Sequence, residues 1–407
     1  MSRARRALVA GLLLGAAPLA AQRAPRLSAR GLDSLRAVTA VDSVDADAWY
    51  RYGLGLWQRR QYDAADSAFR RALRYRPWHS GAHLALGYLM FGRGGRYLFD
   101  LPGRVGPDSA LALLRDALRH RREGYRADPR ADLSALRFLK DDELVPDSRS
   151  VTIGDVTYGT QFFIPALRDM RRAARRLVEG QADSAFAILA RALARRRADQ
   201  TMTDQFIELY ARAALLSGRP AAAADGYREL ARRAGRREAA AAGGPFDLAP
   251  VLNSRGLYLL LYGVAELETG DRAVARAAFQ EALTTDLTFY EAHARLADLA
   301  EAEGDLDAAL EERRAAVATA PDAARPYIDL GVTLLQAGRA REAKAALTEA
   351  VARLPWDPGA QRFLFQAALA AGDRESAARA LAAFRLFAPR RNQEQVAAAT
   401  AQWEAAP

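Results

Sequence analysis

The sequence contains no cysteine and almost no lysine. Without cysteine among its 407 residues, disulfides, thiolate metal sites and cysteine nucleophiles are excluded. All of the basic residues except Lys140 and Lys344 are arginines. After Gln22 no stretch stays apolar for the roughly 18 residues that a bilayer-spanning helix needs, so no further membrane-spanning helix is predicted. Half of the residues are hydrophobic (50%), which predicts a packed core rather than disorder.

The N-terminal segment 1–22 has the pattern of a secretory signal peptide. Arg3, Arg5 and Arg6 form a basic segment, residues 7–17 are mostly apolar, and small residues precede Gln22. We therefore expect a signal peptide over 1–21, cleavage before Gln22, and export to the periplasm or cell envelope; an uncleaved anchor is the alternative. The lack of cysteine excludes a lipid-anchored form.

Charge is divided unevenly along the chain. Residues 256–407 hold 16 basic and 22 acidic residues, whereas residues 22–255 have a net charge of +13. An exported protein is not expected to meet nucleic acid. We therefore expect the basic half to favour acidic proteins or surfaces.

The last third of the sequence repeats with a period of about 34 residues. Small residues recur on this period, and prolines and Gly-Asp or Gly-Arg pairs mark the ends of the predicted helices. The period is visible at Ala275, Ala309, Ala343 and Ala377, and again at Gly270, Gly304, Gly338 and Gly372. This spacing predicts units of two helices joined by a turn.

The segment 46–77 resembles the tetratricopeptide repeat family. The residues that carry the resemblance are Trp49, Gly53, Ala65, Phe69, Ala72 and Pro77. The resemblance extends over most of 46–391 and implies an all-α solenoid of about eight helix–turn–helix repeats in two arrays. The repeats begin near residues 46, 80, 166, 204, 256, 290, 324 and 358.

The repeats and their interruptions divide the chain into segments. The N-terminal repeats extend over 22–129, with an insertion at 92–106, and a connector with a β-hairpin signal follows over 130–165. Degenerate repeats (166–237), a linker (238–255), the C-terminal array (256–391) and a capping helix or tail (392–407) complete the chain. The hairpin signal is the alternating segment SVTIGDVTYG, with Gly154 and Asp155 at the turn.

The glycine-rich segment 87–110 does not fit a nucleotide-binding loop. It has no lysine, and Tyr97 stands where a dinucleotide fingerprint requires its third glycine. We interpret it as an 11-residue loop between two helices with an apolar tip at Tyr97 and Phe99. This tip either folds back on its own helices or contacts a partner.

No constellation of residues predicts catalysis or a metal site. His79 and His83 are four residues apart but lack a third ligand, and the acidic run 141–143 fits a solvated loop. We expect no enzyme activity, no catalytic or metal-binding residue and no cofactor. A hydrolase or metal-dependent enzyme built on the 93–165 insertions is the alternative; it would need His83 or His120 beside residues 141–143.

The resemblance also implies a binding groove. In this family the first helix of each repeat lines a concave groove at repeat positions two, five, nine, twelve and thirteen. These positions place Tyr50, Leu54, Trp57, Tyr88 and Phe91 in the groove of the first two repeats, with Tyr97 and Phe99 as loop contacts. Such aromatic residues are typical of binding hot spots, but packing in the core explains them equally well.

Two further helices bear on the groove. The helix beginning at Gly256 is apolar on both faces, so either the first array or a ligand must cover it. The groove of the sixth repeat is acidic, with Glu291, Asp298 and Glu301. We expect a non-enzymatic scaffold for peptide or protein partners; an envelope assembly factor at anionic surfaces is the alternative.

Overall fold

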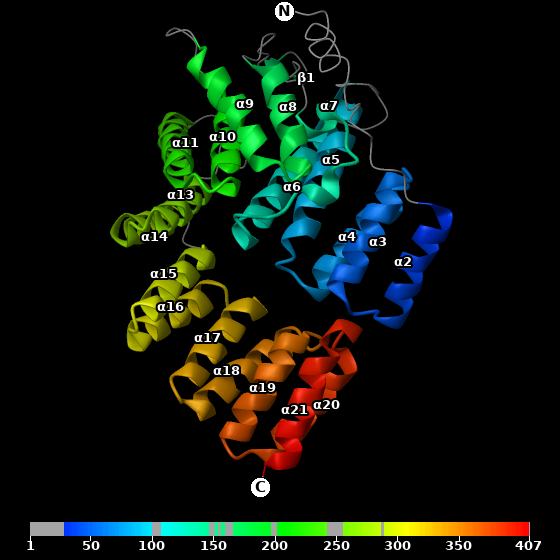
Figure 1. Cartoon of the computed structure of the whole chain (residues 1–407), viewed down its shortest axis with the longest axis vertical. Helices are drawn as coiled ribbons and strands as arrows, with labels where there is room; N and C mark the ends of the chain where they lie inside the picture. The colour runs from blue at the N-terminus through cyan, green and yellow to red at the C-terminus, as the bar shows by residue number, and fades with distance from the viewer. Residues whose placement is uncertain are drawn as a thin grey trace, which may run out of the picture.

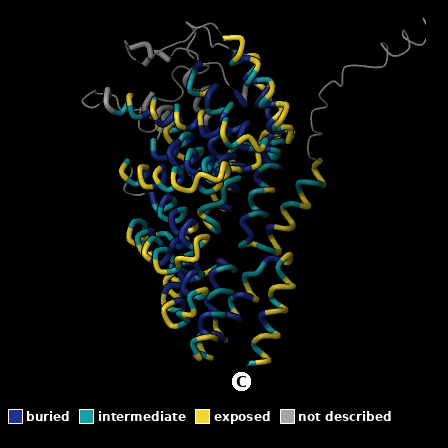
Figure 2. The backbone as a smooth tube through the Cα atoms, turned by 60° about the vertical axis from the view of Figure 1, so that its left-hand side comes forward, coloured by how far each residue is buried: buried dark blue, intermediate teal, exposed yellow. Residues whose placement is uncertain are grey.

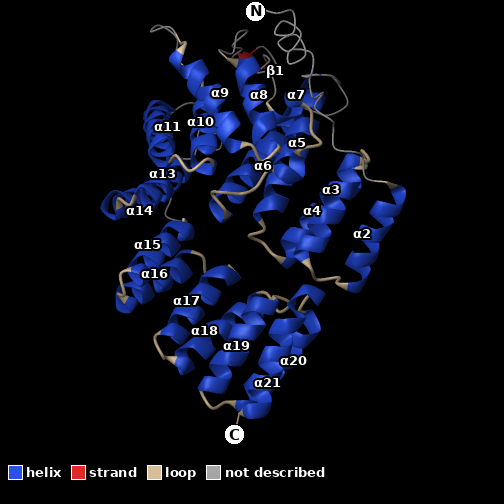
Figure 3. Cartoon of the chain, viewed as in Figure 1, coloured by secondary structure: helices blue, strands red, loops and turns tan. Residues whose placement is uncertain are grey.

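The computed structural model describes residues 28–99, 107–145, 151–153, 156–158, 166–196, 202–241, 255–285 and 289–406. Of these, residues 91–99, 107–111, 114, 142–143, 151–153, 156–158 and 239–241 are described in backbone only. The fold is helical apart from one hairpin (Figure 3).

Antiparallel helix pairs follow one another along the chain. In chain order the elements are α2 (Ala29–Val41), α3 (Ala46–Gln58), α4 (Tyr62–Tyr75), α5 (Ser80–Phe99), α6 (Pro107–Ala127), η1 (Ser134–Leu136), α7 (Asp141–Leu144), β1 (Val151–Ile153), β2 (Val156–Tyr158), α8 (Leu167–Val178), α9 (Ala182–Ala194), α10 (Asp204–Leu216), α11 (Pro220–Ala241), α13 (Arg255–Thr269), α14 (Arg272–Thr285), α15 (Tyr290–Ala302), α16 (Leu306–Thr319), α17 (Ala324–Gln336), α18 (Ala340–Arg353), α19 (Pro358–Ala370), α20 (Arg374–Phe387), η2 (Arg390–Asn392) and α21 (Gln393–Ala405).

The predicted stops between the paired helices are confirmed. At Gly338 the backbone has φ 73°, which places this residue in the left-handed region where glycine has no steric penalty. The next amide, that of Arg339, donates to the carbonyl of Leu334 at 2.9 Å, which closes the helix end. The same left-handed glycine recurs at Gly270, Gly304 and Gly372.

The paired helices approach each other closely because the residues at their contact are small. A Cβ atom on Gly331 would lie 2.4 Å from Leu347 Cγ, so the two helices could not keep their separation with a larger residue. Ala309 and Ala343 have no exposed surface, as expected where helices cross. The repeat register predicted from the sequence is therefore the register of the structure.

The glycine-rich insertion is helical where a loop was expected. Helix α5 continues without interruption from Ser80 to Phe99, so residues 92–99 extend the first helix of the second repeat. Each glycine costs a helix about 1 kcal/mol relative to alanine but leaves the hydrogen-bond ladder intact, and the first proline after Ser80 is Pro102. Residues 100–106 lie outside the described residues.

A short strand pair and a terminal helix complete the described elements. Strands β1 and β2 pair in an antiparallel manner, with Val151 opposite Tyr158 and Ile153 opposite Val156. Helix α21 closes the C-terminal end, where Ala399 is buried against the preceding repeat. A helix with a mostly exposed outer face is what a solenoid needs at its last repeat.

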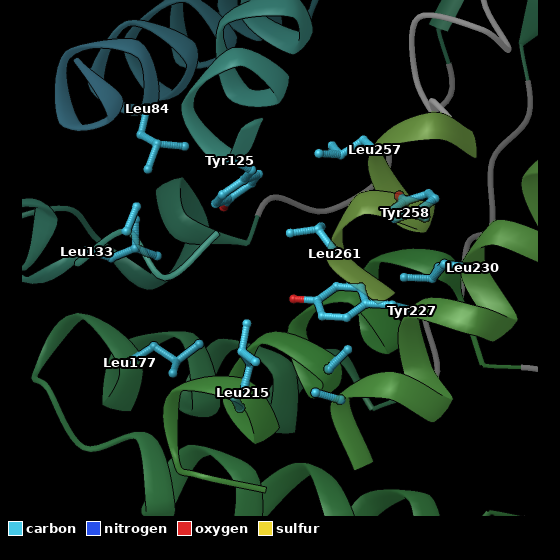
Figure 4. Packing of buried hydrophobic residues seen from close by; sticks show 14 of the residues in the cluster. Leu84, Tyr125, Leu133, Leu177, Leu215, Tyr227, Leu230, Leu257, Tyr258 and Leu261 are labelled. Carbon is cyan, nitrogen blue, oxygen red and sulfur yellow. The ribbon is translucent and has the colours of Figure 1, made fainter. Parts of the chain in front are cut away.

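The predicted linker does not separate two cores. Helices α11 and α13, on either side of it, pack together, and Tyr227 and Leu230 face Leu261 in one cluster (Figure 4). That cluster extends from Leu56 to Leu299 and a second from Leu310 to Ala399, while Ala297, Ala300 and Ala309 form a small cluster that joins α15 to α16. The hydrophobic core therefore continues across the predicted linker.

The solenoid curves round so that its two ends meet. The first repeat, α3 and α4, lies beside the C-terminal repeats, α17 to α21, and the helices form a ring (Figure 1). Exposed residues are spread over the surface of the molecule, and α2 carries many of them (Figure 2). Among the described helices, none has the length and apolarity that crossing a bilayer requires.

Candidate functional site

The four described residues of the predicted groove lie against the protein's own core. Trp57 is only 7% exposed, and its ring centroid lies 6.1 Å from that of Phe69 and 5.2 Å from that of Phe138. Tyr50 is half-buried, 4.8 Å from the ring of His79, and Leu54 packs against the core. Tyr88 is half-buried under the guanidinium of Arg121, 5.5 Å from its ring centroid. The side chains of Phe91, Tyr97 and Phe99 lie outside the described part.

The connector after α6 packs against the predicted groove at Trp57. Phe138, which contacts Trp57, belongs to the segment 131–145, in which every apolar residue is buried or half-buried. Arg212 of α10 donates to the carbonyl of Ala131 at 2.6 Å, and Arg175 of α8 donates to that of Arg137 at 2.8 Å, so two neighbouring helices hold the segment in place. The expectation that Trp57 presents its ring to a ligand does not fit this placement, because the connector already covers the ring.

The chain also covers the apolar helix of the fifth repeat. Leu257, Leu260 and Leu261 of α13 are buried, and Tyr125 of α6 lies across from Leu257 and Leu261 (Figure 4). The sequence left open whether the first array or a ligand covers this helix. In the structure, the first array covers it.

The C-terminal repeats keep a pocket on their concave side. This pocket has a volume of about 360 Å³. Its walls come from α15, α17 and α19, with further residues from α16 and from the turn after α4. The lining residues are Trp78, Glu301, Arg313, Arg325, Ile328, Asp329, Val332, Thr333, Asp357 and Phe363.

One wall of the pocket is a connected polar network. The side chain of Arg313 is 8% exposed and donates to Asp298 Oδ1 at 2.8 Å and to Glu301 Oε1 at 3.0 Å. Thr333 donates its hydroxyl to the same Glu301 oxygen at 2.6 Å. The acidic residues expected in the sixth repeat are therefore largely neutralised by a buried arginine. A satisfied buried network of this kind fixes the shape of a wall.

The other wall is apolar with one ion pair at its rim. Ile328, Val332 and Phe363 lie together with Trp78, and Arg325 lies 5.5 Å from the Trp78 ring centroid. Arg325 Nε donates to Asp329 at 2.8 Å. Burial raises the pKa of the Asp329 carboxyl, and Arg325 opposes that shift. The wall therefore offers apolar surface with a guanidinium at its edge.

The first repeat closes one side of this region. Arg391, just after the last repeat, binds both Asp45 and Asp47, the latter at 2.6 Å. A hydrogen bond from His79, together with the charges of Arg76 and Arg391, holds the pKa of Asp47 well below its usual range. Asp47 is therefore a carboxylate at neutral pH, as its contact with Arg391 requires.

A second charged contact joins α6 to the sixth repeat. Arg126 donates to Glu291 at 2.6 Å, and the two side chains are only 8% and 14% exposed. The guanidinium also lies 4.2 Å from the ring centroid of Phe289. The carboxylate of Glu291, one of the acidic residues expected in the groove, is therefore already paired with an arginine of the same chain.

Two of the histidines, His83 and His120, form a pair. His83 Nδ1 lies 2.9 Å from His120 Nδ1, and His83 Nε2 lies 2.7 Å from the carbonyl of Pro77. Because a carbonyl only accepts, His83 carries its proton on Nε2 and accepts one from His120. Asp141, which the enzyme alternative needs nearby, pairs instead with Arg175 at 2.7 Å. In the described part of the chain, no group of three potential ligands could hold a metal ion.

Part of the pocket could have been found from the sequence. Arg325, Ile328 and Val332 stand at groove positions two, five and nine of the seventh repeat, so the rule applied to the first two repeats also identifies them. No sequence signal identifies Trp78, because it comes from a repeat at the other end of the chain and reaches the pocket only when the ring closes.

Comparison with known proteins gives one family match and several matches of fold. The family model described as tetratricopeptide repeat matches residues 46–77. A search of the curated proteins gives no match. Among solved structures, the crystal structure of the APC/C hetero-tetramer Cut9–Hcn1 is 13% identical over 90% of this chain and 81% of that chain, with a TM-score of 0.37.

Two further solved structures resemble the chain. Yeast Tom70 is 13% identical over 92% of this chain and 91% of that chain, with a TM-score of 0.34. The TPR domain of P58(IPK) is 14% identical over 97% of this chain and 95% of that chain, with a TM-score of 0.24. At these TM-scores the three structures carry no argument about ligands. The repeat assignment depends on the family match at 46–77 and on the helix pairs described above.

Proposed function

Because this chain is a tetratricopeptide-repeat protein, we propose that it is a non-enzymatic scaffold that binds a protein or peptide partner on the concave face of its C-terminal repeats. One observation carries the proposal. Phe138 of the connector covers Trp57, and Tyr125 of α6 lies across from Leu257 and Leu261 of α13, whereas α15, α17 and α19 line a pocket. A concave, partly apolar surface with a few fixed polar groups suits a side chain of a partner.

Photo-crosslinking tests where the partner binds. A benzophenone amino acid at Val332, on the pocket wall, should crosslink to a partner in cells that produce the protein. The same group at Thr348, which is exposed on the outer helix α18, is the matched control and should not. Equal crosslinking at both positions would contradict the proposal.

The crosslinked segment then gives a quantitative test. Once that segment is identified and synthesised, replacement of Phe363 by alanine should weaken its binding at least tenfold, as expected for an aromatic residue at the centre of an interface. Thr348→Ala should leave the Kd unchanged. A Phe363→Ala protein that folds normally and binds with the original Kd would exclude the pocket as the binding site.

We also propose that the protein is exported and acts in the periplasm or cell envelope. The proposal depends on the basic and apolar segments at the start of the sequence, which lie outside the described residues. N-terminal sequencing of the protein from the envelope fraction should give Gln22 as the first residue. An intact Met1 in that fraction would exclude cleavage. The net charge of +13 over 22–255 supports a second candidate, an assembly factor at anionic envelope surfaces.

A further inference from the structure

The first repeat lies on the C-terminal repeats as a bound partner would. Its contact residues fall in two short segments, at the start of α3 and from the end of α4 into the turn that follows, and they meet residues near the opposite end of the chain. We call this set of contacts the closure contact. It shows which side chains the C-terminal repeats accept on this surface.

Two aromatic side chains make the apolar part of the closure contact. Trp78 packs against the cluster of Ile328, Ala350 and Ala360, with Arg325 over its ring at 5.5 Å. Tyr75 meets Trp356 edge to face, with ring centroids 5.7 Å apart. Ring pairs and guanidinium–ring stacks of this geometry are favourable and depend on an aromatic side chain. This surface therefore selects for aromatic residues.

Two carboxylates make the polar part. Arg391 binds Asp45 and Asp47 at once, and its side chain stays 41% exposed. A guanidinium that holds two carboxylates favours an acidic segment over a neutral one. The C-terminal repeats therefore bind acidic and aromatic side chains together on one surface.

We infer that the C-terminal repeats bind a partner segment that is acidic and carries aromatic side chains, in place of the first repeat, and that binding separates the first repeat from them. The inference rests on the proposed function. The tethered first repeat competes with any such partner. The apparent Kd of the partner therefore equals its intrinsic Kd divided by the fraction of molecules in which the contact is open.

Fluorescence energy transfer can follow the closure contact directly. Val41 and Leu386 are 57% and 74% exposed and flank the contact between Asp45 and Arg391. Cysteines at these two positions would be the only ones in the chain, so dyes attach nowhere else. The probe is a synthetic peptide, Asp-Ala-Asp-Gly-Tyr-Arg-Pro-Trp, which joins the side chains of the contact. Control peptides have alanine for both aromatic residues or asparagine for both acids.

The probe should lower energy transfer, and neither control peptide should. Trp78→Ala weakens the tethered competitor, so the probe should bind this variant about tenfold more tightly. Arg391→Gln should lower energy transfer without any peptide, because it weakens the hold on the tethered first repeat. This second variant tests the contact between Arg391 and the two acidic residues by removing the arginine. Melting temperatures show whether both variants fold.

Three results would overturn the inference: no probe binding to Trp78→Ala, binding without a change in energy transfer, or equal binding of the control peptides. Each result differs from failure of the proposed function. A partner that crosslinks at Val332 while energy transfer stays constant would leave the scaffold function in place and remove only the competition with the first repeat.

Discussion

Replacement of Trp57 by alanine is expected to lower the free energy of unfolding by about 3–5 kcal/mol. The ring is 7% exposed and packs edge-on against Phe69 and Phe138, so its loss leaves a cavity between the first repeat and the connector. Chemical denaturation, followed by helical circular dichroism, measures the loss. Binding of a partner by the folded fraction should not change, because the ring lies outside the C-terminal pocket.

A matched control separates burial from residue size. Leu386 is 74% exposed, and its replacement by alanine should change the free energy of unfolding by less than about 0.5 kcal/mol. If Trp57→Ala unfolds at the wild-type denaturant midpoint but loses the partner, Trp57 belongs to a ligand site and the assignment to the core is wrong.

Replacement of Arg126 by methionine is expected to cost about 3–5 kcal/mol at pH 7. The variant leaves Glu291 as a nearly buried carboxylate without the guanidinium that it meets at 2.6 Å. Burial already raises the pKa of Glu291, and the loss of Arg126 raises it further. A raised carboxyl pKa in the folded state makes folding less favourable as pH rises above the ordinary value of 4.5.

The pH dependence identifies the cause of this loss. Below about pH 4 Glu291 is protonated in the folded and the unfolded chain, so the deficit of Arg126→Met should shrink. The double variant Arg126→Met/Glu291→Leu removes both charges and should recover most of the stability at pH 7. Denaturation of the wild type and both variants at pH 7 and pH 4 tests this. A deficit that stays the same at both pH values would show that Arg126 acts through packing alone.

The sequence predicts the repeat better than the site. The positions of Gly270, Gly338, Ala309 and Ala343 follow from local requirements, a left-handed turn residue and a close helix contact, and these requirements recur in every unit. Requirements of this kind can be predicted from the sequence of a single repeat. The glycines of 92–95 were misleading because glycine permits a loop without imposing one.

Which groove positions stay open to a ligand cannot be predicted from the repeat pattern, for a physical reason. A groove position is available to a ligand only if nothing else in the chain covers it, and that depends on contacts between distant segments. Trp57 and Val332 stand at equally good groove positions, yet Phe138 covers the first and the second lines a pocket. Because repeat patterns describe each unit alone, they contain no information about which grooves the connector fills.

The meeting of the two ends has a consequence for how the chain folds. In an open solenoid each repeat needs only its neighbours, so folding can spread from any unit. Here Asp47 obtains its partner Arg391 only after 344 further residues have been synthesised. During synthesis the first repeat therefore emerges without the surface on which it finally rests. The entropic cost of closing so long a loop grows only slowly with its length, so the contact can still form once the C-terminal repeats have been synthesised.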